Sequence, residues 1–176
     1  HTRFVSDWDR KLLKCHYECS DKRAIITNFP ISINKLDSID ENTPLNKSTH
    51  KFRSLSLRSI KLGSISSQSS HPQITYYLSA AFLFGRSAFI TRVPYDPHLT
   101  FSYQTIEQQF YAIRLFTHGW NLYMPTKHIV STFYEKMPHY DSKNKRIYPP
   151  YDVNRGEMSW KRVLYYYGLL SIEEVP

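Results

Sequence analysis

The sequence predicts an α/β fold in which helices flank a mixed sheet, and two observations favour it. Short apolar runs rich in β-branched and aromatic residues alternate with segments of helical periodicity, an order typical of a three-layer arrangement. The 176 residues are enough for one domain with a core, and no internal repeat is evident. We therefore expect a single layered domain built around one mixed sheet.

The first element is a predicted helix over residues 8–18. Ser6 or Asp7 can cap it, because each carries a side-chain oxygen that accepts from the free amides at a helix start. Leu12 and Leu13 are expected to turn inward and to dock the helix on the sheet.

A buried strand is predicted over residues 24–29, stopped by Pro30. The polar stretch over residues 34–71 follows it. Between Pro44 and Pro72 the chain has five Lys or Arg, no acid and many Ser. This composition buries little apolar surface, so the stretch is expected to be a mobile loop, either an insertion or a functional lid.

The second half of the chain is predicted to be rich in regular structure. Its expected elements are strands over residues 74–78 and 81–84, a short helix over 87–92, strands over 121–124 and 129–134, and a docking helix over 159–170. In the last of these, the docking side chains are expected to be Trp160, Val163, Leu164 and Tyr167. A rigid loop is expected around Asp96, which stands between two prolines.

The clearest helix signal covers residues 105–118. Thr105 and Gln108 have the spacing of a capping box, and Gly119 can end the helix. An inner stripe is expected, made of Ile106, Phe110, Ile113 and Thr117.

Acidic residues are scarce in this half. Only Asp96 and Glu107 occur between Gln73 and Tyr134. Asp96 is expected to form a turn with its own backbone. Glu107 lies in the first helical turn, where the helix dipole favours a carboxylate. In group transfer to a hydroxyl, such a carboxylate can orient the acceptor, accept its proton or hold donor hydroxyls. The alternative is an ordinary acid at a helix start.

Glu107 shares a helix stripe with three polar or charged side chains. Tyr111, Arg114 and His118 follow it at spacings of four, three and four residues. The Arg114 guanidinium can hold a carboxylate or a phosphate, and the Tyr111 hydroxyl can bond a sugar hydroxyl.

Several function classes lack their motifs. The eight histidines show no metal-binding spacing, and no P-loop, GxSxG or GxGxxG sequence occurs. Cys15 and Cys19 complete no zinc set, and so few cysteines are compatible with a reducing compartment, so a cytoplasmic location is expected. No apolar run approaches the roughly 20 residues of a membrane span. The basic residues form no nucleic-acid motif, so no nucleic-acid partner is expected.

Several short blocks, in this order and spacing, resemble the N-acetylglucosaminyltransferase family typified by the enzyme that glycosylates hydroxyproline on a ubiquitin-ligase subunit. The blocks are His1-Thr2-Arg3-Phe4, Trp8-Asp9, Phe82-Leu83-Phe84, Val93-Pro94-Tyr95-Asp96-Pro97 and Arg114-Leu115-Phe116-Thr117-His118-Gly119. The resemblance covers most of residues 1–136 outside the Ser-rich stretch, and residues 137–176 are expected to be an extension with the docking helix.

The resemblance implies a retaining glycosyltransferase of the GT-A type, of which this chain is the C-terminal, acceptor-side portion. It implies a UDP-sugar donor, Mn²⁺ or another divalent cation, and a protein or glycan hydroxyl as acceptor. His1 would be the His of the family's Asp-x-His metal motif, and Arg3 would lie at the substrate. The half that binds the nucleotide base would precede this motif.

The family's Gly-Glu-Glu-Ile stretch falls on residues 106–109. Glu107 keeps the acid that would contact the sugar, and Gln108 replaces the second acid. Ala80 and Ala81 match a small-residue segment that lets the sugar approach the backbone. Trp8 and Trp120 are candidates for stacking on the acceptor, although each side chain is more commonly part of a core.

The largest departure from the family pattern is at Thr132. Thr132 stands where the family has a metal-binding His, and a hydroxyl is a poor ligand for Mn²⁺. His128 could substitute only after a shift of the loop or strand. Two hypotheses therefore come first: a glycosyltransferase, and a glycosyltransferase-like module that binds a glycan or a protein without turnover. A third, for which the sequence has no motif, is nucleic-acid binding through the basic Ser-rich stretch.

Overall fold

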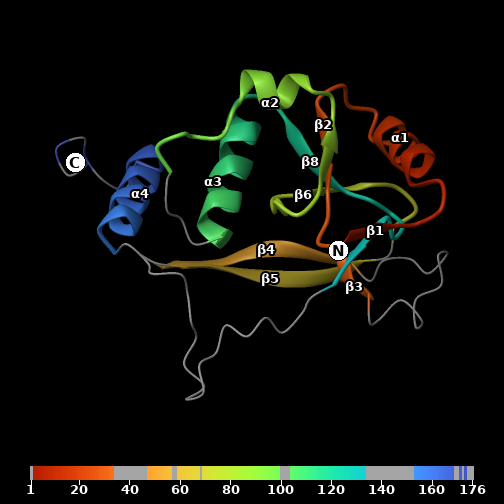
Figure 1. The fold of residues 1–176 in the computed structure, drawn as a ribbon, viewed down its shortest axis with the longest axis horizontal. Helices are drawn as coiled ribbons and strands as arrows, with labels where there is room; N and C mark the ends of the chain where they lie inside the picture. Colours follow the sequence, from red (N-terminus) through yellow and green to blue (C-terminus); the bar gives the residue numbers. More distant parts are fainter. Residues whose placement is uncertain are drawn as a thin grey trace, which may run out of the picture.

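The computed structural model describes residues 2–33, 47–56, 59–67, 69–99, 104–133, 153–168, 171 and 173. Within these ranges it contains two mixed sheets, a separate hairpin and four helices (Figure 1). The mixed α/β class predicted from the sequence is confirmed. His1, and residues 137–152 of the predicted extension over 137–176, lie outside the described residues.

The central sheet has four strands in the order β6-β8-β2-β7. They are β6 (Gln73–Thr75), β8 (Asn121–Met124), β2 (Ala24–Thr27) and β7 (Leu83–Gly85). β2 and β8 run parallel, whereas the two outer strands run antiparallel to their neighbours. The carboxyl ends of β2 and β8 therefore lie at the same edge of the sheet.

Side chains of β2 alternate between two cores, as the period of a strand requires. Ile25 packs with helices α2 (Ala88–Arg92) and α3 (Gln104–Thr117). Ile26 packs instead with helix α1 (Trp8–Glu18). The helices thus cover opposite faces of the sheet, and the expected three-layer arrangement is confirmed (Figure 1).

A second, smaller sheet continues from the carboxyl edge of the first. It has the order β1-β9-β3, with β1 (Thr2–Phe4), β9 (Val130–Thr132) and β3 (Ile31–Ser32). β1 runs antiparallel to β9, and β3 runs parallel to it. The segments that join β2 to β3 and β8 to β9 therefore both leave the central sheet at the same edge and enter the second sheet.

Helix α1 has the predicted bounds, but two details of its prediction are wrong. Asp7 has a left-handed backbone (φ 53°) and makes no side-chain cap, a conformation that Asp tolerates better than most residues. Leu13 is 62% exposed, because Leu12 and Cys15 occupy the inner face of the helix.

The inner stripe predicted for α3 is also wrong. Phe110 is buried, but Ile113 and Thr117 are exposed. The helix is covered on two sides, by the sheet and by α4 (Val153–Tyr166), so its buried face is wider and rotated. That face carries Gln109, Phe110, Tyr111, Ala112 and Leu115. The helix begins at Gln104, so Thr105 is inside it and not at the predicted cap.

The C-terminal helix docks on α3 as expected, through Val163 packed against Phe110. It begins six residues before the predicted start and ends at Tyr166. No helix in the described part of the chain combines the length and apolar composition that a membrane span requires.

The Ser-rich stretch departs most from its prediction. β4 (Lys47–Ser56) and β5 (Ser59–Ser67) pair as an antiparallel hairpin, so a mobile loop is wrong for these residues. Ile60 and Leu62 alternate with polar residues as in a strand, and hairpin pairing satisfies backbone groups without a large core. β5 contacts α3, and the hairpin passes beneath the lower end of α3 in Figure 1.

Candidate functional site

The carboxyl end of β2 organises the small-residue turn. Thr27 Oγ1 donates to the Phe82 carbonyl at 3.1 Å and accepts from the Ser79 amide at 2.9 Å. The two bonds hold both ends of the turn that carries Ala80 and Ala81. Both alanines are exposed at this edge of the sheet.

The first turns of α3 are tied to the same segment. The Tyr77 hydroxyl donates to Gln108 Oε1 at 2.9 Å. Tyr77 is only 7% exposed, and burial raises the pKa of its hydroxyl to about 12, so it acts as a neutral donor. Gln108 is therefore held close to the chain that leads into Ala80, and half-buried Glu107 precedes it.

Tyr111 is not available to a sugar, contrary to its prediction. Its side chain is 1% exposed, and its hydroxyl donates to the Val93 carbonyl at 2.8 Å. Burial is the main cause that raises the pKa of Tyr111 to about 12. The Tyr111 ring stacks on Tyr95 with centroids 3.8 Å apart and planes inclined by 20°.

Asp96 forms the predicted turn and also a buried ion pair. Its Oδ1 accepts from the His98 amide at 2.9 Å, and its Oδ2 accepts from Arg162 Nε at 2.8 Å. Arg114 Nη1 lies 4.0 Å from the same Oδ2, so this guanidinium contacts Asp96. Burial raises the pKa of Asp96, but the bonds from Arg162 and His98 and the two guanidinium charges outweigh it, so that the pKa is lowered.

The metal side of the predicted site lies on the second sheet. In register, Thr2 faces Thr132 and exposed Arg3 faces Ser131. Thr132 is thus opposite the residue that follows His1, the position where the resemblance places a metal ligand. The neutral Thr132 hydroxyl does not fit Mn²⁺.

His128 does not take the place of the missing ligand. It is 3% exposed, and its Nε2 lies 2.7 Å from Ser131 Oγ, a bond that fixes the ring inside the fold. Among the residues that the structure describes, no three His, Cys, Asp or Glu side chains are grouped as metal ligands would be. The described part of this edge therefore does not fit a manganese site.

The two tryptophan candidates differ in access. Trp120 is 4% exposed and contacts Phe89 in the core, so the reading as an acceptor platform is wrong for it. Trp8 is 40% exposed and packs on Phe4, with ring centroids 4.6 Å apart. Phe4 in turn contacts Phe82, which follows Ala81.

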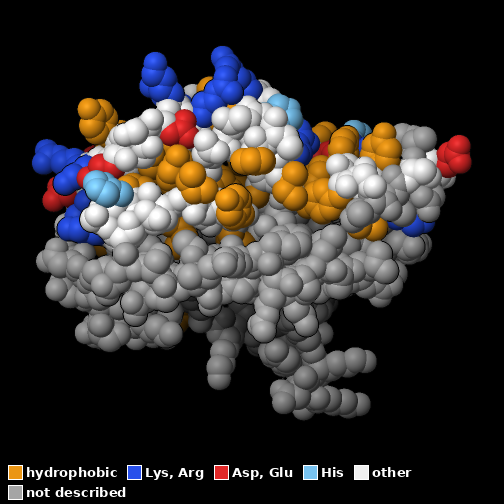
Figure 2. All heavy atoms as spheres, turned by 180° about the vertical axis from the view of Figure 1, so that it is seen from behind, with side chains coloured by type: hydrophobic (Ala, Val, Ile, Leu, Met, Phe, Trp, Pro, Cys, Tyr) orange, Lys and Arg blue, Asp and Glu red, His pale blue; other side chains and the backbone are white. Residues whose placement is uncertain are grey.

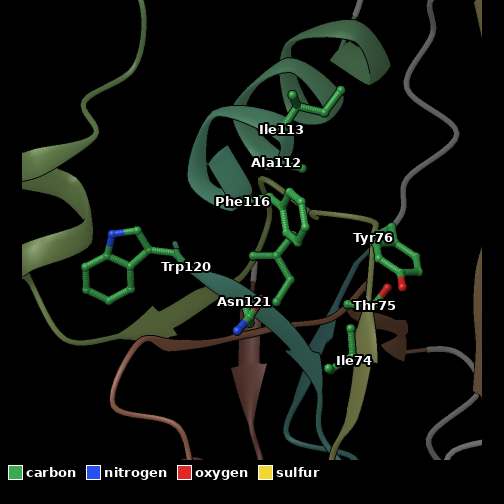
Figure 3. A pocket seen from close by; sticks show the side chains of 9 residues that line it. Ile74, Thr75, Tyr76, Ala112, Ile113, Phe116, Trp120 and Asn121 are labelled. Carbon is green, nitrogen blue, oxygen red and sulfur yellow. The ribbon is translucent and has the colours of Figure 1, made fainter. Parts of the chain in front are cut away.

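A shallow apolar pocket of about 110 Å³ lies elsewhere, between β6 and the second half of α3 (Figure 3). Its lining residues are Ile74, Thr75, Tyr76, Ala112, Ile113, Phe116, Trp120, Asn121 and Leu122. Phe116 and Tyr76 are 61% and 71% exposed, and hydrophobic side chains also gather across the described back face in Figure 2. The lining has no acid, base or metal ligand, so this pocket is not the predicted site of chemistry.

Comparison with known proteins identifies the family of the chain. The sequence profile of the glycosyltransferase (GlcNAc) family matches residues 1–171. The chain belongs to that family. No curated protein matches the chain. The family match extends past residue 136, and the division of the chain at that residue stays a prediction.

Two contacts of this glycosyltransferase domain were not expected from its sequence. Arg162 lies 66 positions from Asp96, and no local pattern links them. The stack of Tyr95 on Tyr111 was also missed. The only signal was the pair of prolines around Asp96, which indicates a rigid loop but not the helix that it contacts.

Proposed function

We propose that the domain acts in the transfer of a sugar, N-acetylglucosamine, from a UDP-sugar to a hydroxyl of a protein or glycan, with retention. One observation carries the proposal. The Tyr77–Gln108 bond and the two bonds of Thr27 bring the start of α3 and the Ala80–Ala81 turn to one edge of the sheet. Open α/β sheets bind their ligands at this edge.

The proposed reaction exchanges one bond for another at the anomeric carbon. The acceptor oxygen bonds to that carbon as the bond to the UDP oxygen breaks, and the acceptor proton passes to the leaving diphosphate or to a carboxylate. Glu107 contacts the transferred sugar or the acceptor hydroxyl, and Gln108 hydrogen-bonds the sugar. The exposed backbone of Ala80 and Ala81 lets the sugar approach, and Arg3 contacts the substrate at the neighbouring strand.

Manganese is part of the proposal only through the resemblance, with His1 as its ligand in this chain. A cytoplasmic location also stays a prediction, based on the small number of cysteines.

A binding module without turnover is the second candidate, and Thr132 favours it. Loss of one metal ligand weakens cation affinity, and Gln108 has replaced the second acid. Such a module would hold a glycan or a protein through the same exposed edge.

Release of sugar from UDP-N-acetylglucosamine by the full-length protein, with Mn²⁺, separates the two candidates. Turnover that is lost in Glu107→Gln supports the transferase. Absence of turnover together with retained glycan binding contradicts it and supports the module.

A further inference from the structure

The loop over residues 93–96 lies along the face of α3 that carries Glu107. Tyr111 is four residues after Glu107, so the two side chains are neighbours on one helical face. The Tyr95 ring stacks on Tyr111 at 3.8 Å and so lies over this face. Asp96 contacts Arg114, which is one further turn along the helix.

Tyr95 is held at both sides by bonds that leave it little freedom. The Val93 carbonyl accepts from the Tyr111 hydroxyl at 2.8 Å, and Asp96 accepts from Arg162 Nε at 2.8 Å. The residue between these anchors is nevertheless 39% exposed. A tyrosine with a fixed ring and an open edge is suited to contact another group.

The electrostatics agree with this placement. Burial raises the pKa of Tyr95, and the negative charge of Glu107 raises it further. The stack on Tyr111, four residues after Glu107, and this charge effect both indicate that Tyr95 lies near Glu107. Burial and the Tyr95 charge raise the pKa of Tyr111, whereas the Arg114 charge lowers it.

We propose that Tyr95 is a positioning residue for Glu107, and that the loop over residues 93–96 exists to hold it there. The Tyr95 hydroxyl stays protonated and donates to the Glu107 carboxylate, so that one carboxylate oxygen faces the sugar. This role rests on the proposed transferase function, but the pairing of the two side chains does not.

The pairing is tested by ¹³C NMR of the full-length protein with labelled tyrosine rings. Tyr95→Phe identifies the Tyr95 resonance. In Glu107→Gln, we expect the Tyr95 titration to move to lower pH, while the Tyr111 titration stays in place. An unchanged Tyr95 titration in Glu107→Gln overturns the inference.

The role is tested by kinetics with UDP-N-acetylglucosamine. Tyr95→Phe keeps the stacked ring and loses the hydroxyl, so we expect kcat to fall about tenfold with KM and Tm unchanged. The matched control, Tyr17→Phe on α1, loses the hydroxyl of an 85% exposed ring away from the loop and should leave kcat, KM and Tm unchanged.

The outcomes separate the two claims. Tyr95→Phe that turns over like the wild type overturns the positioning role. A protein without any turnover, whose Tyr95 titration still moves in Glu107→Gln, supports the pairing and contradicts the transferase proposal.

Discussion

The two sides of the candidate site differ in how they are built. On the α3 side, Gln108 is hydrogen-bonded to a buried tyrosine, and the next turns of the helix pack into the main core. On the β1–β9 side, the strand that follows His1 is exposed along its whole length, and its partner carries Thr132. The side proposed to contact sugar carries an acid and a held amide, whereas the side proposed to bind the cation carries Thr132, a neutral hydroxyl.

This difference bears on two separate properties of the site, which are sugar recognition and cation binding. A sugar contact depends on held polar side chains and backbone, and the structure holds Gln108 and both ends of the Ala80–Ala81 turn. Cation affinity depends on the number and type of ligands, and Thr132 supplies a neutral hydroxyl. We therefore expect sugar recognition to be stronger than metal binding in this protein.

The largest expected effect comes from removing the Glu107 carboxylate on the α3 side of the site. Glu107→Gln removes the charge and keeps the shape, so sugar transfer should fall by about 100-fold or more. Since Glu107 is half-buried at a helix start, Tm should change little. Steady-state kinetics and thermal melting measure the two quantities.

Glu18→Gln on α1 is the matched control, because this acid lies on another helix, where it pairs with Lys14 at 3.9 Å. It should leave turnover unchanged. Equal loss in both variants would show that Glu107 has no special role.

The ion pair of Asp96 with Arg162, which joins the loop before α3 to α4, can be removed separately. Asp96→Asn removes the charge that pairs with Arg162 and leaves that guanidinium without its carboxylate. We expect unfolding to become easier by about 2 kcal/mol, because bonds to charged groups are stronger than neutral ones. Denaturant unfolding measures the difference, and Lys161→Gln on the same helix is the control.

The same pair predicts a dependence on pH. The pKa of Asp96 is lowered below its ordinary value of 3.8, so the unfolded chain binds the proton first. The stabilisation is fully present above about pH 4 and is lost as the pH falls through the folded pKa. The difference in unfolding free energy between wild type and Asp96→Asn should therefore shrink in acid. A difference that stays constant down to pH 2 would contradict the ion pair.

The proposed cation site on the β1–β9 side is tested by substitution of Thr132. Thr132→His restores an imidazole opposite the residue that follows His1, so the Mn²⁺ concentration for half-maximal turnover should fall about tenfold. Thr132→Ser, which keeps a hydroxyl, should not change it. If the histidine variant needs as much Mn²⁺ as the wild type, the metal does not lie at this edge.

Elements bounded by strong local signals could be predicted from the sequence. Helix α1 and strand β8 have the predicted bounds, and Gly119, with φ of 78°, ends α3 as expected. β6 is shorter than predicted, because the Tyr77 amide bonds to Thr75 Oγ1 and turns the chain. The bond depends on the orientation of the Thr75 hydroxyl, which a pattern of apolar residues does not reveal.

The site could be predicted in part. Glu107 and Gln108 follow from the resemblance and stay predictions, and the sequence did not reveal the bond of Gln108 to Tyr77. The role of Tyr111 was wrong, because the stripe that it shares with Glu107 turns partly into the core. The contact of Asp96 with Arg162 joins a loop to a helix 66 positions away, and the local spacing of residues does not predict how such segments pack.

The smallest expected effect comes from Tyr77→Phe, which tests whether the position of Gln108 depends on the Tyr77 hydroxyl. Tyr77→Phe keeps the ring that packs 4.7 Å from Phe29 and removes only the hydroxyl that donates to Gln108. A neutral hydrogen bond contributes about 1 kcal/mol, so we expect a drop in Tm of a few degrees. Because Gln108 would then be free to rotate, KM for the sugar donor should rise about two- to threefold while kcat stays constant. Gln108→Ala should raise KM less in the Tyr77→Phe background than in the wild type, since a Gln108 without its bond to Tyr77 already contacts the sugar less well. Additive effects would mean that Gln108 contacts the sugar without help from Tyr77, and that the backbone of α3 alone positions this side of the site.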